Sequence, residues 1–288
     1  MMAEAPGHLL GQIIGNALEQ SIEPLLRAVA SEHGLYLDKK GPRPARSGVK
    51  LTWTDGLNNS HDLDYVLERA GSDNERGKPA AFVESAWRRY TKHSRAKAQE
   101  IQGALLPLLL HYSDVKPFAG AVVAGRWTDS ALQQMRSSGF AVLHVSYDAF
   151  VAAFSTYGID IDADESTPDD YLRAQVDAYR RLTDAERLAI SSALCDIATD
   201  EYRQFEQALS GSLTRKVSRI LVIPLYGERQ EFNCIADALT AISDYPVDGG
   251  PRGAFVRFEI HLTYSNGDSI VANFEHKADA AEFVRSFA

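Results

Sequence analysis

The pattern of hydrophobic and polar positions divides the first 160 residues into long helical and short strand-like segments. Apolar residues recur at helical spacing in residues 8–33, and Gly34 supplies a stop signal. Shorter apolar runs predict strands at residues 49–53, 63–68, 80–87, 118–125 and 140–147. Further helices are predicted at residues 91–110, 128–139 and 148–158. Because the later strands alternate with helices, part of the sheet is expected to be parallel.

The remaining segments suggest a chain in three parts. The turn-rich basic stretch at residues 38–48 is expected to be a loop, and the acidic stretch at 160–170 a linker. Helical pattern follows to about residue 209, and the tail shows a strand, a helix, two strands and a helix. We find no internal repeat. The expected parts are a core (1–160), an acidic linker with a helical segment (161–215), and a small α+β module (216–288).

Composition and cysteine usage indicate an ordinary globular protein. The chain has 288 residues, of which 45% are hydrophobic and 24% charged. No apolar run is long enough for a signal peptide or a membrane span, so we expect no membrane association. Cys195 and Cys234 form neither a metal-ligand pair nor a disulfide framework, which makes the reducing cytoplasm the expected location.

The charge of the chain is distributed unevenly. The formal net charge of −9 argues against a general coat of positive charge for nucleic acid, but it leaves room for a local basic groove. Residues 85–99 carry five bases and no acid. The sequence therefore places one concentrated basic surface directly behind Glu84.

Two acidic residues near strand ends are candidates for metal ligands. Asp64 lies at the start of one predicted strand, and Glu84 interrupts the apolar run of the next. Mg²⁺ prefers oxygen ligands and keeps several waters, so two carboxylates are enough protein ligand. A metal held there could activate water and neutralise charge on a phosphate. Asp62 is a rival to Asp64 at the same strand start.

The basic helix that follows offers one lysine on its buried side. With about 100° per residue, Lys97 falls within the apolar stripe that contains Ile101 and Leu105, whereas Lys92 and Arg95 point away. A lysine on a buried stripe needs an acidic partner. We therefore expect Lys97 to face Glu84 and to stabilise charge, with Lys92 as the alternative functional lysine.

These residues resemble the motif of the PD-(D/E)XK, or restriction-endonuclease-like, nucleases: a strand-start Asp, a strand with Glu about twenty residues later, and a basic helix. The resemblance covers about the first 150–160 residues. It implies an α/β fold with a mixed sheet flanked by helices, and Mg²⁺-dependent cleavage of DNA in which Mn²⁺ could substitute. It also implies Asp64 and Glu84 as metal ligands with the Ser85 carbonyl, and Glu19 or Glu23 as a further acidic residue.

Two positions depart from the family pattern. Leu63 stands where proline is common, and Ala86 stands where the family has its lysine. Either the lysine function has moved to Lys97 on the following helix, or the site is inactive. The first case predicts an endonuclease of restriction or defence type, and the second a degenerate nuclease fold that binds nucleic acid or serves in assembly.

The expected partner is DNA, most simply double-stranded, although RNA remains an alternative. Phosphate contacts are expected from the basic residues that follow Glu84 without an intervening acid, namely Arg88, Arg89, Lys92 and Arg95. Arg43 and Arg46 of the basic loop are further candidates. Cleavage of both strands calls for two active sites. A homodimer formed through the C-terminal module is therefore expected.

Overall fold

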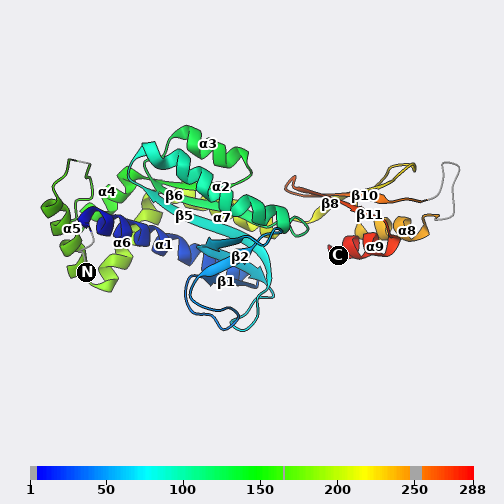
Figure 1. Ribbon diagram of the computed structural model, residues 1–288, viewed down its shortest axis with the longest axis horizontal. Helices are drawn as coiled ribbons and strands as arrows, with labels where there is room; N and C mark the ends of the chain where they lie inside the picture. Colours follow the sequence, from blue (N-terminus) through cyan, green and yellow to red (C-terminus); the bar gives the residue numbers. More distant parts are fainter. Residues whose placement is uncertain (1–4, 165, 247–254) are drawn as a thin grey trace. The chain divides into compact units, whose positions relative to one another are not determined.

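The computed structural model describes residues 5–164, 166–246 and 255–288 (Figure 1). The chain divides into two compact units, Met1–Ser210 and Gly211–Ala288. Each unit has its own sheet and its own hydrophobic core. The boundary differs from the expected three-part division, because the helical segment up to residue 210 belongs to the first unit.

The first unit is built on a five-stranded mixed sheet in the order β1-β4-β5-β6-β7. Its antiparallel half consists of β1 (Leu35–Lys39), β4 (Tyr65–Arg69) and β5 (Lys78–Arg88), and its parallel half continues from β5 through β6 (Phe118–Gly125) and β7 (Ala141–Ser146). The predicted α/β class, with a mixed sheet flanked by helices, is confirmed.

The central strands form where the sequence has continuous apolar runs. All eight residues of β6 are buried, and β5 is buried from Pro79 to Glu84. Strands covered on both faces require this composition, whereas half-exposed strands alternate. Glu84 is the charged residue that interrupts the buried part of β5.

Helices cover both faces of this sheet (Figure 1). One side carries α2 (Ser94–His111) and α3 (Asp129–Ser137). A short 3₁₀ turn, η1 (Thr91–His93), precedes α2. The other side carries the long α1 (Pro6–Glu32), with α4 (Tyr147–Ser155) near the end of β7. The predicted apolar stripe of α2 is buried, and Thr128 caps α3 by accepting a hydrogen bond from Ala131 N.

Two strands were missed by the pattern analysis. β1 overlaps the expected loop at residues 38–48, and β3 (Ser60–Leu63) pairs with β2 (Leu51–Thr54) in a separate hairpin. Both are short, and neither alternates: the three apolar residues of β1 are consecutive, and β3 has a single apolar residue.

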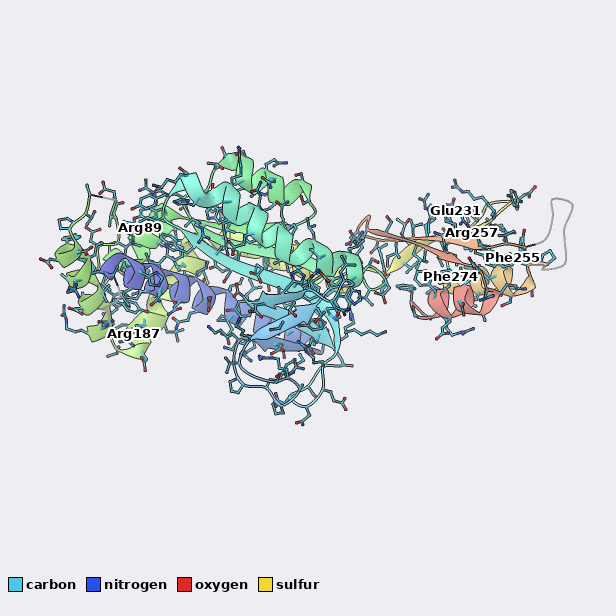
Figure 2. The ribbon with its side chains drawn as sticks, in the orientation of Figure 1. Arg89, Arg187, Glu231, Phe255, Arg257 and Phe274 are labelled. Carbon is cyan, nitrogen blue, oxygen red and sulfur yellow. The ribbon has the colours of Figure 1, made fainter. Side chains whose placement is uncertain are left out.

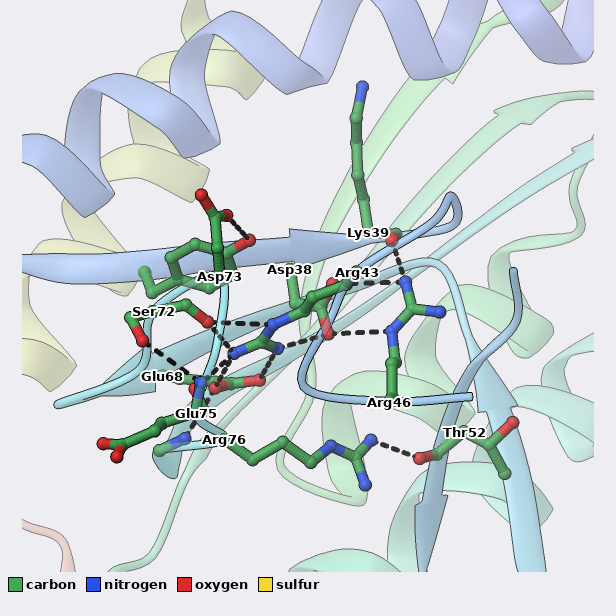
Figure 3. Close-up of polar contacts among 12 residues, drawn as sticks. Asp38, Lys39, Arg43, Arg46, Thr52, Glu68, Ser72, Asp73, Glu75 and Arg76 are labelled. Carbon is green, nitrogen blue, oxygen red and sulfur yellow. Dashed lines mark hydrogen bonds and ion pairs between the residues drawn. The ribbon is translucent and has the colours of Figure 1, made fainter. Parts of the chain in front are cut away.

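Arg43 lies inside the protein, at the centre of a buried polar cluster (Figure 3). Its side chain is only 2% exposed and pairs with Asp38 at 2.6 Å and with Glu68 at 2.7 Å. It also donates to the carbonyl oxygens of Ser72 and Glu75. Because Glu68 is fully buried, this guanidinium compensates a charge that would otherwise be costly.

Arg46 reinforces the same cluster. Its side chain, 6% exposed, contacts Asp38 and donates to the carbonyl oxygen of Lys39 (Figure 3). It also donates to the carbonyl oxygen of Lys50. We expected Arg43 and Arg46 to contact phosphates from a mobile basic loop. Both guanidinium groups are instead occupied inside the fold, where they tie residues 40–50 to β1 and β4.

The helical segment predicted after the acidic stretch consists of three helices, α5 (Asp169–Arg181), α6 (Asp184–Ile197) and α7 (Thr199–Leu213). α5 and α6 pack along α1 and extend the first unit. A capping box, in which Thr183 and Glu186 satisfy each other's backbone N–H groups, begins α6.

The second unit has a four-stranded antiparallel sheet in the order β11-β10-β8-β9. Its elements are β8 (Val217–Pro224), β9 (Gln230–Phe232), α8 (Ile235–Asp244), β10 (Phe258–Tyr264), β11 (Ser269–Phe274) and α9 (Lys277–Arg285). The predicted elements are present, and the Asn266-Gly267 hairpin joins β10 to β11. The additional element is β9.

This unit corrects the expectation that the chain has no internal repeat. The order β8-β9-α8 is followed by β10-β11-α9, and the two first strands pair at the centre of the sheet. Where the second strand passes into the helix, "FNCIADALTAI" at 232–242 aligns with "FEHKADAAEFV" at 274–284, and four of the eleven positions are identical. Ala238 and Ala280 occupy equivalent positions and are both fully buried. The unit therefore consists of two ββα repeats.

Replacing Arg43 with Ala should destabilise the protein by about 3–5 kcal/mol, because it leaves Glu68 buried without a counter-charge. Urea unfolding followed by circular dichroism measures the change. Lys50→Ala is the matched control, since it breaks an ion pair with Asp62 in which both side chains are largely exposed. Equal effects of the two substitutions would contradict the structural role of Arg43.

Candidate active site at the centre of the first sheet

The strand register brings Asp64 and Glu84 together. β4 pairs antiparallel with β5, with Tyr65 opposite Val83, so Asp64, one residue earlier, lies beside Glu84. Asp64 N donates to Glu84 Oε1 at 3.2 Å. Asp64 Oδ2 accepts from both the backbone N–H and the hydroxyl of Ser85, at 2.7 and 2.9 Å. The two carboxylates predicted from the sequence are thus neighbours.

Glu84 is the strongly perturbed member of this pair. The residue is 8% exposed. Burial, followed by the negative charge of Asp64, raises the pKa of Glu84 to about 8, while the hydrogen bond from Asp64 N and the positive charge of Lys97 oppose this shift. A carboxyl group with these properties holds a proton at neutral pH unless a cation replaces it.

Glu19 of α1 adds a third carboxylate to the neighbourhood. Partial desolvation and the charge of Asp64 raise its pKa. The alternative acid, Glu23, is engaged elsewhere, because it accepts from Arg27 at 2.6 Å and from Lys39 at 2.7 Å. Of the two acids on α1 that we considered, Glu19 is the one that is electrostatically linked to Asp64.

The structure also separates Asp62 from the pair. Its carboxylate accepts from Lys50 and from Thr52 across the β2–β3 hairpin, at 2.5 and 2.6 Å. Those contacts lower the pKa of Asp62, which is the opposite of the shift at Glu84. Asp64 is therefore the better candidate of the two.

Lys97 lies on the inner side of α2, as the helical spacing predicted. Its side chain is 16% exposed, whereas Lys92 and Arg95 are exposed residues. It is close enough to Glu84 to lower the pKa of that carboxyl. In this conformation, however, Lys97 Nζ donates to Glu100 Oε1 at 2.5 Å. An ammonium group has three N–H donors, so this contact leaves Lys97 able to donate to further acceptors.

A pocket of about 360 Å³ opens beside these residues, at the carboxyl end of β5. It is lined by the first turns of α1, by residues 85–88 and by Lys97. Ala86, at the position where the related motif has lysine, contributes a small side chain to its wall. The pocket leaves space between the sheet end and Lys97 for a group larger than water.

Basic side chains gather at the same end of the sheet. Arg88 donates to the Trp87 carbonyl and lies 3.9 Å from Glu100. Arg89, labelled in Figure 2, has a buried Nη2 atom that lacks a hydrogen-bond partner within the described residues. Arg95 reaches Ser130 at 3.4 Å, and Lys92 lies 5.3 Å from the ring of Tyr90.

Arg126 was missed by the sequence analysis and extends this basic end. Its backbone N–H donates to the Arg88 carbonyl at 2.9 Å, and its guanidinium lies over the ring of Tyr147 at 4.4 Å. Gly125 permits the contact: its φ is +93°, and a Cβ there would lie 2.1 Å from Arg88 O. The sequence feature that could have indicated Arg126 is its position directly after a buried parallel strand, because ligand sites often lie at the carboxyl ends of such strands.

The donor set is compatible with a hard divalent cation. Within the described residues, neither Asp64 Oδ1 nor Glu84 Oε2 takes part in a hydrogen bond, so each carboxylate retains one oxygen for a further partner. Within those residues, no group of three or more His, Cys, Asp or Glu forms a metal cage. Asp64, Glu84 and the Ser85 carbonyl could therefore hold Mg²⁺ only with water completing the shell.

Comparisons with known proteins add no family. No family model matches the chain, and no curated protein or solved structure matches it. Within the described residues, no helix combines the length and the apolar character that a membrane crossing requires.

The pKa of Glu84 predicts how stability depends on pH. Because the folded-state pKa of about 8 lies above the ordinary value of 4.5, Glu84 stabilises the fold at low pH, and this contribution is lost as the pH rises toward 8. The free energy of unfolding should fall by up to about 4 kcal/mol from pH 5 to pH 8 relative to Glu84→Gln. Urea titrations of both proteins test this, and parallel pH profiles would contradict it.

Proposed function

We propose that the protein is a Mg²⁺-dependent endonuclease that hydrolyses DNA phosphodiester bonds. The observation that carries this proposal is the juxtaposition of Asp64 with the buried Glu84, next in sequence to Ser85, which lines the same pocket as Lys97. Its resemblance to the PD-(D/E)XK motif suggests the reaction class, and restriction or phage defence is the setting that this class favours. The chemistry depends on the site and not on the fold class alone.

In the proposed site, Asp64, Glu84 and the Ser85 carbonyl hold the ion, and Glu19 contributes through water. A bound Mg²⁺ would supply Lewis acidity, activating a water and neutralising charge on the phosphate. Binding requires Glu84 to release its proton, so metal affinity should increase with pH. Mn²⁺ has similar ligand preferences and should substitute.

Lys97 takes the place of the motif lysine in this proposal. Ala86 leaves space where that lysine would stand, and Lys97 enters the same pocket from α2. Its ammonium group would orient the attacking water and stabilise negative charge on the phosphate oxygens. Glu100 would then act as a resting partner that Lys97 leaves when the phosphate binds.

The basic residues at the carboxyl end of β5 would follow the DNA backbone. The buried Nη2 atom of Arg89 has no hydrogen-bond partner within the part of the chain that the structure describes, and Lys92 and Arg95 lie on the exposed side of η1 and α2. Such contacts give affinity without reading sequence. Cleavage of both strands favours a homodimer with two such sites, in the cytoplasm that the two free cysteines suggest.

One observation favours a different class of function. The ammonium of Lys97 is already bound to Glu100, and Ala86 removes the lysine from its usual position. A catalytically inactive nuclease fold that binds nucleic acid, or serves as an assembly subunit, would have this appearance. Calorimetric titration with Mn²⁺ distinguishes the two, because an inactive site has no need to bind metal.

Removing the central side chains should abolish cleavage. We expect Glu84→Ala, Asp64→Asn and Lys97→Ala each to reduce the rate of plasmid cleavage with Mg²⁺ by at least about 100-fold. Gel assays over a time course measure the rates. Asp62→Asn is the matched control and should retain activity, because Asp62 pairs with Lys50 and Thr52. Cleavage that survives in all three variants would overturn the assignment of the site.

The basic surface should control affinity through salt-dependent contacts. Each of Lys92→Ala and Arg95→Ala should weaken DNA binding and reduce the slope of log affinity against log salt concentration by about one. Fluorescence anisotropy in Ca²⁺ or EDTA measures binding without cleavage. Arg203→Ala on α7 is the control, since that exposed base pairs with Asp200. Loss of affinity that is equal for all three variants would exclude a defined basic groove.

A further inference from the structure

The two outer strands of the second sheet come from equivalent positions in the ββα repeats. β9 is the second strand of the first repeat, and β11 is the second strand of the other. Phe232 and Phe274 end these strands at matching positions, immediately before α8 and α9. Each strand lies at one edge of the sheet, so the chain provides an internal comparison of two related edges.

β9 has the features of a protected edge. It is three residues long, and its central residue is Glu231, labelled in Figure 2. The carboxylate of Glu231 lies 3.3 Å from Arg229 and 3.9 Å from Arg219. A short strand that presents a cluster of charged side chains is a poor template for another strand.

β11 lacks this protection. It is twice as long, "SIVANF" at 269–274, and contains neither charge nor proline. Its register with β10 continues without a shift from Ser269 to Phe274, so no bulge turns the edge aside. Val271 is 55% exposed. Long, regular and uncharged edges are the ones that pair with other strands.

The hairpin fixes which groups of β11 point outward. Tyr264 N donates to Asp268 O, and this bond determines which residue pairs of β10 and β11 are hydrogen-bonded to each other. In an antiparallel pair, hydrogen-bonded and non-hydrogen-bonded residue pairs alternate. The backbone N–H and C=O groups of Ile270 and Ala272 therefore bond to β10, and those of Val271 and Asn273 point away from it. Ile270 belongs to the core beneath the helices, so the side chains of Val271 and Asn273 lie on the opposite face.

We propose that β11 pairs antiparallel with β11 of a second copy of this chain, with Val271 opposite Val271 of the second copy. Symmetric pairing brings no like charges together, because the strand has none. It covers the most exposed apolar side chain of the edge and extends the sheet across a two-fold axis. If the two strands paired with Asn273 opposite Asn273, Val271 would lie near the end of the hydrogen-bonded region and would stay exposed.

This interface is independent of the chemistry proposed for the first unit. A dimer would supply the two active sites that cleavage of both strands requires. The experiments below measure mass and covalent linkage, not cleavage, so failure of the interface and failure of the nuclease assignment are separate outcomes.

The first experiment measures the mass of the full-length chain by light scattering over a range of micromolar concentrations. The native protein should have twice the chain mass of 31.7 kDa. Val271→Lys places two like charges together on the axis, and Asn273→Pro removes an outward N–H without affecting the bonds to β10. Both should raise the dimer dissociation constant at least about tenfold. Gln230→Lys on β9 is the control and should remain dimeric.

Two outcomes of that experiment are decisive. An equal mixture of Val271→Lys and Val271→Glu should regain the dimer, which a variant that merely fails to fold cannot do. A native chain that remains monomeric at tens of micromolar, or a Gln230→Lys chain that dissociates as Val271→Lys does, would overturn the proposal.

The second experiment tests the register by disulfide formation in a Cys234→Ser background, since Cys234 is exposed. In Val271→Cys the two Cα atoms would lie about 5.5 Å apart, within disulfide range. In Asn273→Cys they would lie roughly 13 Å apart. Mild oxidation should therefore link the first variant into a covalent dimer and leave the second unlinked. The reverse result, or equal linkage, would overturn the proposed pairing.

Discussion

The arrangement of the first unit depends on β5, which pairs antiparallel with β4 on one side and parallel with β6 on the other. The antiparallel register places Asp64 beside Glu84. The parallel register brings the end of β6 next to Arg88, where Arg126 follows. A single strand thus connects an acidic region in the sheet with a basic region at the sheet end. Pairing with β4 alone or with β6 alone would not bring the acidic and the basic region onto one strand.

The acidic region is maintained against an electrostatic cost. Glu84 is almost fully buried beside another carboxylate, and only a backbone N–H and the charge of Lys97 favour its ionised form. Arg43 shows the other solution available to this chain, because there two buried acids are matched by two guanidinium groups, those of Arg43 and Arg46. The fold therefore compensates buried charge fully at Arg43 and incompletely at Glu84. Incomplete compensation is typical of a functional site.

The sequence predicted what depends on local patterns and missed what depends on distant partners. β6 and the buried stripe of α2 follow from apolar spacing, and so did the inward position of Lys97. The burial of Arg43 depends on Glu68 and on the carbonyls of a turn, none of which its neighbours in sequence reveal. The ββα repeat escaped notice because its identities are few and its hairpins differ in length.

That repeat makes the second core a shared one. Each ββα half contributes one central strand, and side chains of both halves meet in a single hydrophobic cluster. Because both halves belong to one chain, their association is intramolecular and takes place at a high effective concentration. Completion of this core is therefore independent of protein concentration, unlike a core formed by two separate chains.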